Sequence, residues 1–280
     1  MSSSSASTIH RLWSRILRNA AALARLRVLE CLRHGTCYDV IGKSAGGDIT
    51  KQFDVVAEQT MVRYLERFTS FTLVSEETGI KQIGSNPEGF LIMDPIDGST
   101  NLSHNIPFAC LAIAYATEMI FDAVEVAVVL DLFSGKCYHA TKGGEAFRNQ
   151  ERIHPSDANP LEDSLVGIDA EVPPKSLMKA LEEIDERRVK FTRHFGANAM
   201  ELCFVADGTL DGFIDLRGVF RGTDLAAASL ILQESGAVLV DPKGVQIKGK
   251  CSNDARYAYI AARDNVFAKR LLALVSGNKK

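Results

Sequence analysis

The segment Asp94–Asn101, with the sequence DPIDGSTN, holds the residues best suited to chemistry. Its two acids lie three positions apart, after the apolar run Phe90–Met93, so a buried strand would bring both carboxylates to one place. Desolvated carboxylates repel each other unless one takes a proton or a cation lies between them. Gly98 permits a tight turn, and the following Ser-Thr-Asn is typical of a helix start, where anions bind. The segment predicts a site for cations and a phosphate, with an ordinary turn as the alternative.

Further acids lie beside apolar runs in other parts of the chain. They are Glu76 and Glu77 after the run 71–75, Asp224 at the start of a helix-like segment, and Asp48 and Asp54 on either side of residues 49–53. Oxygen ligands without histidine or cysteine suit Mg²⁺, Mn²⁺ or Ca²⁺ rather than zinc. Because Mg²⁺ binds a few carboxylates together with water and substrate phosphate, the set favours metal-assisted phosphate chemistry.

Three blocks of this sequence resemble the inositol monophosphatase superfamily of Mg²⁺-dependent, lithium-sensitive sugar phosphatases. They are Ser75-Glu76-Glu77, the DPIDG(S/T)xN signature at Asp94–Asn101, and Thr223–Ala227 followed by Glu234-Ser235-Gly236. Their order and spacing also agree, so the resemblance covers nearly the whole chain from the first helix onward. It implies an α/β fold with an α+β first half, a layered αβαβα sandwich of the inositol monophosphatase and fructose-1,6-bisphosphatase type.

The resemblance also implies a set of metal ligands. Glu76, Asp94 and the main-chain carbonyl of Ile96 would bind a first metal, while Asp94, Asp97 and Asp224 would bind a second. Asp94 would bridge the two ions. The cofactor implied is Mg²⁺, with two or three ions per site and Mn²⁺ as a substitute. Such ions neutralise the phosphate, lower the pKa of a bound water and stabilise the leaving alkoxide.

Catalytic roles follow from the same resemblance. Asp54 and Ser99 match the carboxylate and hydroxyl that position and activate the attacking water. Glu77 matches a neighbouring acid that helps in catalysis or holds a third metal, with a solvated surface acid as the alternative. The main-chain N–H groups of Gly98 and Ser99, together with Asp97, would hold the transferred phosphate.

The resemblance to archaeal-type members of the family also implies four residues that bind the substrate. They are Arg193, Asn198, Asp215 and Arg217, at positions around the sugar or a second phosphate. An arginine offers a planar fork to a phosphate, although an exposed surface arginine fits the sequence equally well. His104 and His194 match no catalytic position of the family, so we interpret them as structural or rim residues.

The leading hypothesis is therefore a Mg²⁺-dependent phosphomonoesterase that hydrolyses small sugar phosphates by attack of metal-activated water. Fructose 1,6-bisphosphate and inositol monophosphate are the expected substrates. A phosphatase for a nucleotide-linked phosphate, 3′-phosphoadenosine 5′-phosphate or NADP, is the alternative within the same chemistry. A non-catalytic sugar-phosphate sensor is the alternative from another class, but a pure binder has little use for a water-activating pair. The family also implies a homodimer.

Composition limits the partners and the location. With 280 residues, 46% of them hydrophobic and 24% charged, the chain is typical of a globular protein and not of a disordered one. A net charge of −3 argues against nucleic acid as a partner, and no apolar run is long enough to span a membrane. The six scattered cysteines predict reduced thiols in the cytoplasm. The serine- and arginine-rich start is interpreted as part of a first helix, with a targeting segment as the alternative.

Periodicity predicts the elements that must position these residues. Helices are expected at 9–33, after a flexible start, and at 54–68, with Asp54 at or just before the second helix. Residues 42–47 and 81–89 read as loops because of their glycines and polar residues. Residues 108–140 are rich in β-prone stretches and predict a sheet of antiparallel or mixed strands, and strands alternate with helices afterwards. We therefore expect an N-terminal half, 1–148, with most metal ligands, and a C-terminal half, 149–280, with Asp224 and the substrate residues.

Overall fold

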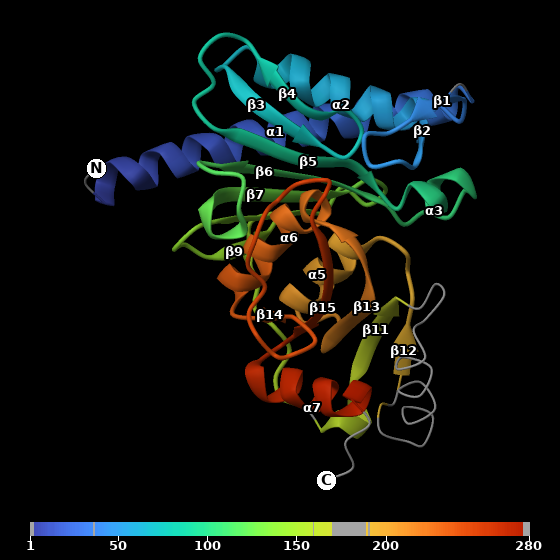
Figure 1. Ribbon diagram of the computed structural model, residues 1–280, viewed down its shortest axis with the longest axis vertical. Helices are drawn as coiled ribbons and strands as arrows, with labels where there is room; N and C mark the ends of the chain where they lie inside the picture. Colours follow the sequence, from blue (N-terminus) through green and yellow to red (C-terminus); the bar gives the residue numbers. More distant parts are fainter. Residues whose placement is uncertain (1–2, 36, 159, 170–188, 190, 277–280) are drawn as a thin grey trace.

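The computed structural model describes residues 3–35, 37–158, 160–169, 189 and 191–276. Two large sheets lie between three layers of helices, in the order helix, sheet, helix, sheet, helix (Figure 1). This order confirms the expected layered αβαβα sandwich. No helix in these ranges is long and apolar enough to span a membrane.

The larger sheet has eight strands in the order β10-β9-β8-β7-β6-β5-β3-β4. They are β3 (Phe71–Ser75), β4 (Gly79–Ile83), β5 (Phe90–Asp97), β6 (Cys110–Ala116), β7 (Val124–Asp131), β8 (Cys137–Thr141), β9 (Ala146–Arg148) and β10 (Glu151–Arg152). The pair β3 and β5 is parallel, whereas the other pairs are antiparallel. The ends of β3 and β5 therefore meet at one edge of the sheet, where the acids of the two motifs follow.

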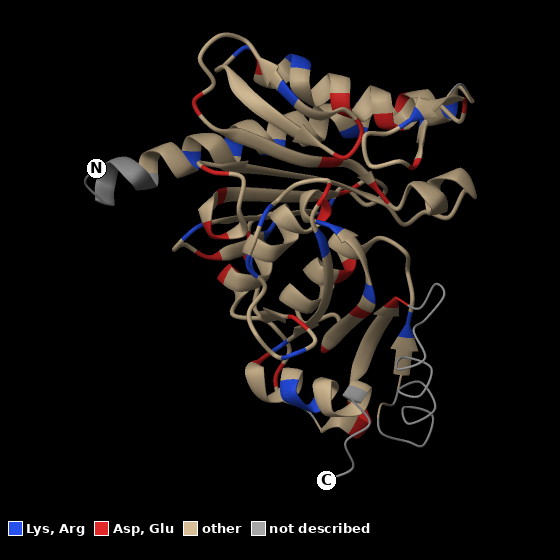
Figure 2. Ribbon diagram, in the orientation of Figure 1, with Lys and Arg blue, Asp and Glu red and all other residues tan. Residues whose placement is uncertain are grey.

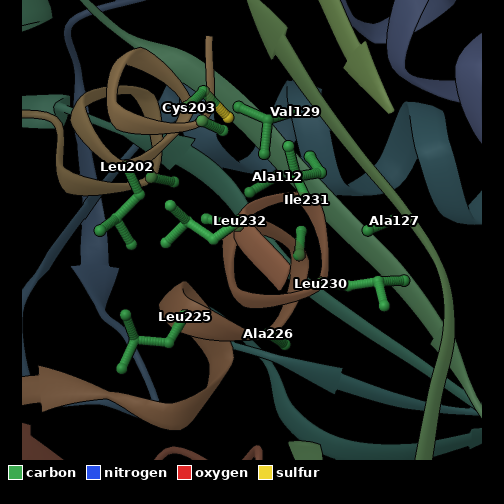
Figure 3. Packing of buried hydrophobic residues seen from close by; sticks show 14 of the residues in the cluster. Ala112, Ala127, Val129, Leu202, Cys203, Leu225, Ala226, Leu230, Ile231 and Leu232 are labelled. Carbon is green, nitrogen blue, oxygen red and sulfur yellow. The ribbon is translucent and has the colours of Figure 1, made fainter. Parts of the chain in front are cut away.

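Strand β6 shows why helices can cover both faces of this sheet. Its side chains alternate, so Leu111 and Ile113 pack toward α1 (Ser3–Arg33) and α2 (Gln52–Leu65). Ala112 and Ala114 face the opposite side, together with α5 (Asn198–Ala206) and α6 (Gly222–Ser235). Figure 3 shows side chains of α6 lying near Ala112 and near Ala127 of the neighbouring strand β7. Small side chains on that face let α6 approach the sheet closely.

The smaller sheet carries the second half of the chain. Its strand order is β12-β11-β13-β15-β14, formed by β11 (Leu165–Asp169), β12 (Phe191–Arg193), β13 (Gly212–Arg221), β14 (Val238–Val240) and β15 (Arg256–Ala262). Helix α7 (Asn265–Ser276) covers its outer face, and α5 and α6 lie between the two sheets (Figure 1). Since β13 ends where α6 begins, the first turn of α6 lies at the interface of the two halves. The boundary at residues 148 and 149 stays a prediction.

Short elements complete the fold. They are the hairpin of β1 (Val40–Lys43) and β2 (Ile49–Lys51), the helix α3 (Ser99–Ser103), and the 3₁₀ turns η1 (Phe121–Ala123) and η2 (Leu161–Asp163). Several expected boundaries were wrong in part. Helix α1 begins at Ser3 rather than Ile9, and α2 covers Gln52–Leu65 rather than 54–68. Residues 42 and 43 of one expected loop belong to β1, and residues 81–83 of the other belong to the edge strand β4. The largely exposed side chains of β4 explain why its sequence shows no apolar alternation.

The expectation of six reduced cysteines was also wrong. Cys31 and Cys37 form a disulfide with their Cα atoms 5.3 Å apart. Helix α1 ends at Arg33, and Gly35, with a φ of 71°, turns the chain back toward that end. This reversal brings together two cysteines whose spacing resembles no metal or redox motif. Cys110, Cys137, Cys203 and Cys251 are free thiols, as expected.

The packing of α1 on the larger sheet yields a test of stability. Leu17 is fully buried in the cluster between α1, α2 and the sheet, whereas Leu26 on the same helix is 56% exposed. Leu17→Ala should lower the free energy of unfolding by about 2–5 kcal/mol, because it leaves a cavity. The matched control Leu26→Ala should change it by no more than about 0.5 kcal/mol. Urea denaturation measures both, and equal effects would contradict this packing.

Candidate active site

Three carboxylates from distant parts of the chain converge where the two halves meet. Glu76 directly follows β3, Asp94 lies in β5 and Asp224 lies in the first turn of α6. Each offers an oxygen atom that lies within 4.8 Å of the others. The parallel pairing of β3 and β5 sets Ser75 opposite Met93, which puts Glu76 beside Asp94. Figure 2 shows acidic segments of the larger sheet and of α6 facing one another.

Burial and mutual repulsion control the protonation of this group. Burial raises the pKa of Asp94 well above its usual value, and the charges of Glu76 and Asp224 raise it further. Burial, followed by the charge of Asp224, likewise raises the pKa of Glu76. Burial raises the pKa of Asp224 to about 6. Three carboxylate oxygens without histidine or cysteine fit a hard divalent cation, which would relieve this repulsion.

Asp97 and Ile96 continue β5 past the carboxylate group. A register irregularity between Asp94 and Asp97 shifts the chain. Asp97 Oδ2 accepts a hydrogen bond of 2.6 Å from the main-chain N–H of Ala199 in α5, and burial raises the pKa of Asp97 to about 7. The N–H of Ile96 donates to Asp94 Oδ1 at 3.0 Å. Asp97 therefore lies next to the group of three, where its charge acts on Asp94.

Asp54 and Asp224 occupy equivalent positions on two helices. Each is the third residue of its helix and accepts a hydrogen bond from the main-chain N–H of the basic residue before the helix. Lys51 N donates to Asp54 Oδ2 at 2.8 Å, and Arg221 N donates to Asp224 Oδ2 at 3.3 Å. Helix α2 begins at Gln52, two residues before Asp54, and this hydrogen bond at the helix start fixes the direction of the Asp54 carboxylate.

Glu77 lies in the same region as Asp54. The hydroxyl group of Thr50 donates a hydrogen bond to Glu77, and burial raises the pKa of that acid. Burial, followed by the charge of Glu77, raises the pKa of Asp54 to about 8. A carboxyl group that titrates near neutral pH is suited to accept a proton from water.

Gly98 turns the chain between β5 and α3. Its φ is 90°, and an added Cβ would lie 2.9 Å from the carbonyl oxygen of Phe108 and 3.0 Å from the Cβ of Ala197. Both the left-handed backbone and the lack of space therefore require glycine. Ser99 begins α3 directly after this turn.

A cleft of about 810 Å³ runs from the acids into the second half of the chain. Its size suits a small-molecule ligand. The sequence-predicted residues that line it are Glu76, Glu77, Ile96, Asp97, Gly98, Ser99, Asn198 and Arg217. Other lining residues include Asp48, Lys51, His104, Asp169 and His194.

The far end of the cleft is a hydrogen-bonded network around Asp215. Asn198 Nδ2 donates to Asp215 Oδ2 at 3.1 Å and to the Tyr259 hydroxyl at 2.9 Å. Arg217 Nε donates to Asp215 Oδ1 at 3.1 Å, and its guanidinium group also pairs with Asp169. These contacts hold Arg217 in one orientation, with 13% of its side chain exposed.

The structure separates Arg193 from the other predicted substrate residues. Arg193 is exposed on the edge strand β12, donates to the carbonyl of Thr192 at 2.7 Å and is not among the residues that line the cleft. His194, which we interpreted as a rim residue, does line it. The side chains of adjacent residues in an extended segment point to opposite sides.

Sequence reasoning missed a clamp on the segment Phe195–Gly196, which lines the cleft. Glu201 is completely buried, and its carboxylate accepts hydrogen bonds from the two N–H groups of this segment, at 3.4 and 3.2 Å. Asn101 Nδ2 donates to both carbonyl groups of the segment, at 2.6 and 3.3 Å. Burial raises the pKa of Glu201 to about 8. Asn101 closes the DPIDG motif and so was visible in the sequence, whereas no pattern marked Glu201.

Arg221 was missed as well. Its guanidinium group donates to Glu76 Oε1 at 2.6 Å and to the carbonyl of Gly46 at 3.1 Å, and it also pairs with Asp48. The only sequence signal for this residue is its position three residues before Asp224.

The raised pKa values predict how stability depends on pH. Without divalent cations, Asp54, Asp97 and Asp224 keep protons in the folded state at pH values where the unfolded state has lost them. The free energy of unfolding should therefore fall as pH rises from about 4 to about 8. The fall should exceed about 1 kcal/mol, because one unit of pKa corresponds to about 1.4 kcal/mol.

Thermal melts in a chelator between pH 5 and pH 8 measure this slope. Asp54→Asn should reduce it, whereas Asp122→Asn, at an exposed residue paired with Lys248, should leave it unchanged. A melting temperature that rises over this range would contradict the assignment.

Comparisons with known proteins show the family of this chain. The model of the inositol monophosphatase family matches residues 13–279. A bifunctional NADP phosphatase/NAD kinase of Methanococcus maripaludis is 32% identical over 86% of this chain, which spans only 45% of that relative's length. A fructose-1,6-bisphosphatase/inositol-1-monophosphatase of Methanocaldococcus jannaschii is 30% identical and covers 94% of this chain and 99% of its own length.

Solved structures show the same fold. The crystal structure of an inositol monophosphatase–fructose 1,6-bisphosphatase, 30% identical, matches 94% of this chain and 99% of its own with a TM-score of 0.83. The IMPase of Thermotoga maritima, 23% identical, matches 95% of this chain and 96% of its own with a TM-score of 0.76, a likeness in fold. The chain belongs to the inositol monophosphatase family.

Proposed function

We propose that this protein is a Mg²⁺-dependent phosphatase of small sugar phosphates, with fructose 1,6-bisphosphate and inositol monophosphate as its substrates. The observation that carries the proposal is the buried group Glu76, Asp94 and Asp224, which lies beside a cleft of about 810 Å³. Carboxylates so close together would bind divalent cations, and bound divalent cations attract the oxygens of a phosphate group.

The proposed chemistry divides between the cation and the protein. Glu76, Asp94, Asp97, Asp224 and the Ile96 carbonyl would hold Mg²⁺, which lowers the pKa of a bound water and neutralises the phosphate. The main-chain N–H groups of Gly98 and Ser99 would bind the phosphate oxygens, because the Gly98 turn leaves them at the end of β5.

Proton transfer would fall to the side chains beside the cleft. Asp54 would accept the proton of the attacking water. Burial raises the pKa of its carboxyl group, which makes the ionised form a stronger base than an exposed aspartate. The Ser99 hydroxyl would orient the water, and Glu77 would support the charge on Asp54 or hold a further cation.

The sugar would lie at the far end of the cleft. Asn198, held by the completely buried Asp215, would meet its hydroxyl groups, and Arg217 would meet a second phosphate. The exposed Arg193 would contact only substrates that reach the rim.

A nucleotide-linked substrate is the second candidate. Two relatives that match 86% of this chain, at 32% and 29% identity, are named bifunctional NADP phosphatase/NAD kinase. The chain spans less than half of either relative, so the proposal concerns only the phosphatase reaction. We further propose a homodimer, from the family resemblance alone. The expected location in the cytoplasm depended on six reduced cysteines, and the Cys31–Cys37 disulfide argues against it.

The metal mechanism predicts the effect of removing one ligand charge. Asp224→Asn and Asp97→Asn should each lower kcat/KM at least about a hundredfold, because cation binding loses a carboxylate. Phosphate release from fructose 1,6-bisphosphate at fixed Mg²⁺ measures this loss. The control Asp122→Asn, at an exposed acid outside the cleft, should retain wild-type turnover. Full turnover of the wild type in excess chelator would rule out the mechanism.

A substrate panel tests the specificity. Fructose 1,6-bisphosphate and inositol 1-phosphate should give a higher kcat/KM than 3′-phosphoadenosine 5′-phosphate and NADP at equal Mg²⁺. A nucleotide preferred by more than about tenfold, which is about 1.4 kcal/mol in transition-state stabilisation, would establish the second candidate instead. Tight phosphate binding without turnover of any of the four would indicate a sensor.

A further inference from the structure

Arg221 touches two of the three converging carboxylates in two different ways. Its main-chain N–H donates to Asp224 Oδ2 at 3.3 Å, and its Nη1 donates to Glu76 Oε1 at 2.6 Å. Only 12% of its side chain is exposed, so the ion pair with Glu76 is poorly screened by water. The described part of the chain thus already contains one cation at the acids that would hold Mg²⁺.

The same guanidinium group fastens the turn 44–48 to the acids. Nη2 donates to the carbonyl of Gly46 at 3.1 Å and pairs with the carboxylate of Asp48. The guanidinium group packs directly against Gly46, since an added Cβ there would lie 2.7 Å from three of its atoms. The main chain of the turn is also bonded to the acidic pair, because Gly46 N donates to the Glu76 carbonyl at 3.3 Å.

The guanidinium group of Arg221 does not use all of its hydrogen-bond donors. Arg221 Nε is buried and has no hydrogen-bond partner among the described residues. Asp48, in contrast, has a carboxylate that is 66% exposed and can keep the guanidinium group in a more hydrated position. The unsatisfied Nε and the exposed second acceptor allow the guanidinium group to leave Glu76 once another cation neutralises that carboxylate.

We propose that Arg221 is an internal counter-ion that competes with the divalent cation for Glu76 and so lowers the metal affinity of the site. The proposal rests on the metal-dependent function above. In metal-free protein Arg221 offsets the repulsion among Glu76, Asp94 and Asp224. A bound divalent cation takes over this role, and the guanidinium group moves from Glu76 toward Asp48. Metal binding is thereby coupled to the turn 44–48 at the edge of the cleft.

Two variants of the full-length chain separate this contact from a general effect of charge. Arg221→Gln removes the cation, and Gly46→Ala keeps every charge while it displaces the guanidinium group. Gly46 has no left-handed φ, so alanine strains no backbone there. Arg256→Gln is the matched control, because Arg256 is exposed and binds the main-chain carbonyls of Asn253 and Ala255.

Titration with Mn²⁺ by calorimetry and electron paramagnetic resonance measures the tightest site at pH 8. Arg221→Gln should bind Mn²⁺ about tenfold more tightly than the wild type, which is about 1.4 kcal/mol. Gly46→Ala should shift the affinity in the same direction and Arg256→Gln should leave it near the wild-type value. In a chelator, Arg221→Gln should melt at a lower temperature, so that affinity rises while metal-free stability falls. A purely structural role for Arg221 would lower both.

Several results would overturn the inference. Weaker Mn²⁺ binding by Arg221→Gln would make Arg221 a residue that positions Glu76 for the metal. Equal affinities of Gly46→Ala and the wild type, or an equal gain in Arg256→Gln, would reduce the effect to charge. These outcomes leave the proposed function intact because the wild type still binds Mn²⁺. A wild type that binds no Mn²⁺ would contradict both proposals.

Discussion

The repulsion among Glu76, Asp94 and Asp224 is the constraint on which the site depends. Their oxygens lie within 4.8 Å of one another, and the charge of Asp224 raises the pKa of both Glu76 and Asp94. The fold must hold the three carboxylates together against this repulsion. Each acid is therefore anchored by a rigid element. Glu76 directly follows β3, Asp94 lies within β5, and Asp224 lies in the first turn of α6. Helix N–H groups near Asp224 and the guanidinium group of Arg221 supply positive charge against this repulsion.

The layered fold provides the rigidity that these anchors need. Helix α6 lies between the two sheets, where Ala112 and Ala127 of the larger sheet leave room for Leu230 and Ile231 (Figure 3). Because α6 packs on both sheets, its first turn cannot move away from β5 without opening the central core. The geometry of the candidate site and the stability of the fold thus depend on the same contacts.

Much of the site could be predicted because its residues are close in sequence or follow recognisable strands. The residues of the motif Asp94–Asn101 are positioned by one strand and one turn, and local sequence propensity predicts both. Strand β4 escaped prediction because an exposed edge strand has no apolar alternation. Glu201 and Arg221 escaped because a buried glutamate in a helix and an arginine before a helix have ordinary local patterns. Their partners lie five or six positions away for Glu201, and in the other half of the molecule for Arg221.

The sequence by itself determined the residue types of the site, the strands and helices that carry them and the family to which they belong. It could do so because periodicity and turn chemistry are local and the three motifs are specific. Only the tertiary structure decided which charges face one another: that Arg221 pairs with Glu76, that Arg217 is held by Asp215, and that Arg193 lies outside the cleft. Coulomb interactions and desolvation depend on distance and burial in space, and neither quantity is encoded in the spacing of residues along the chain.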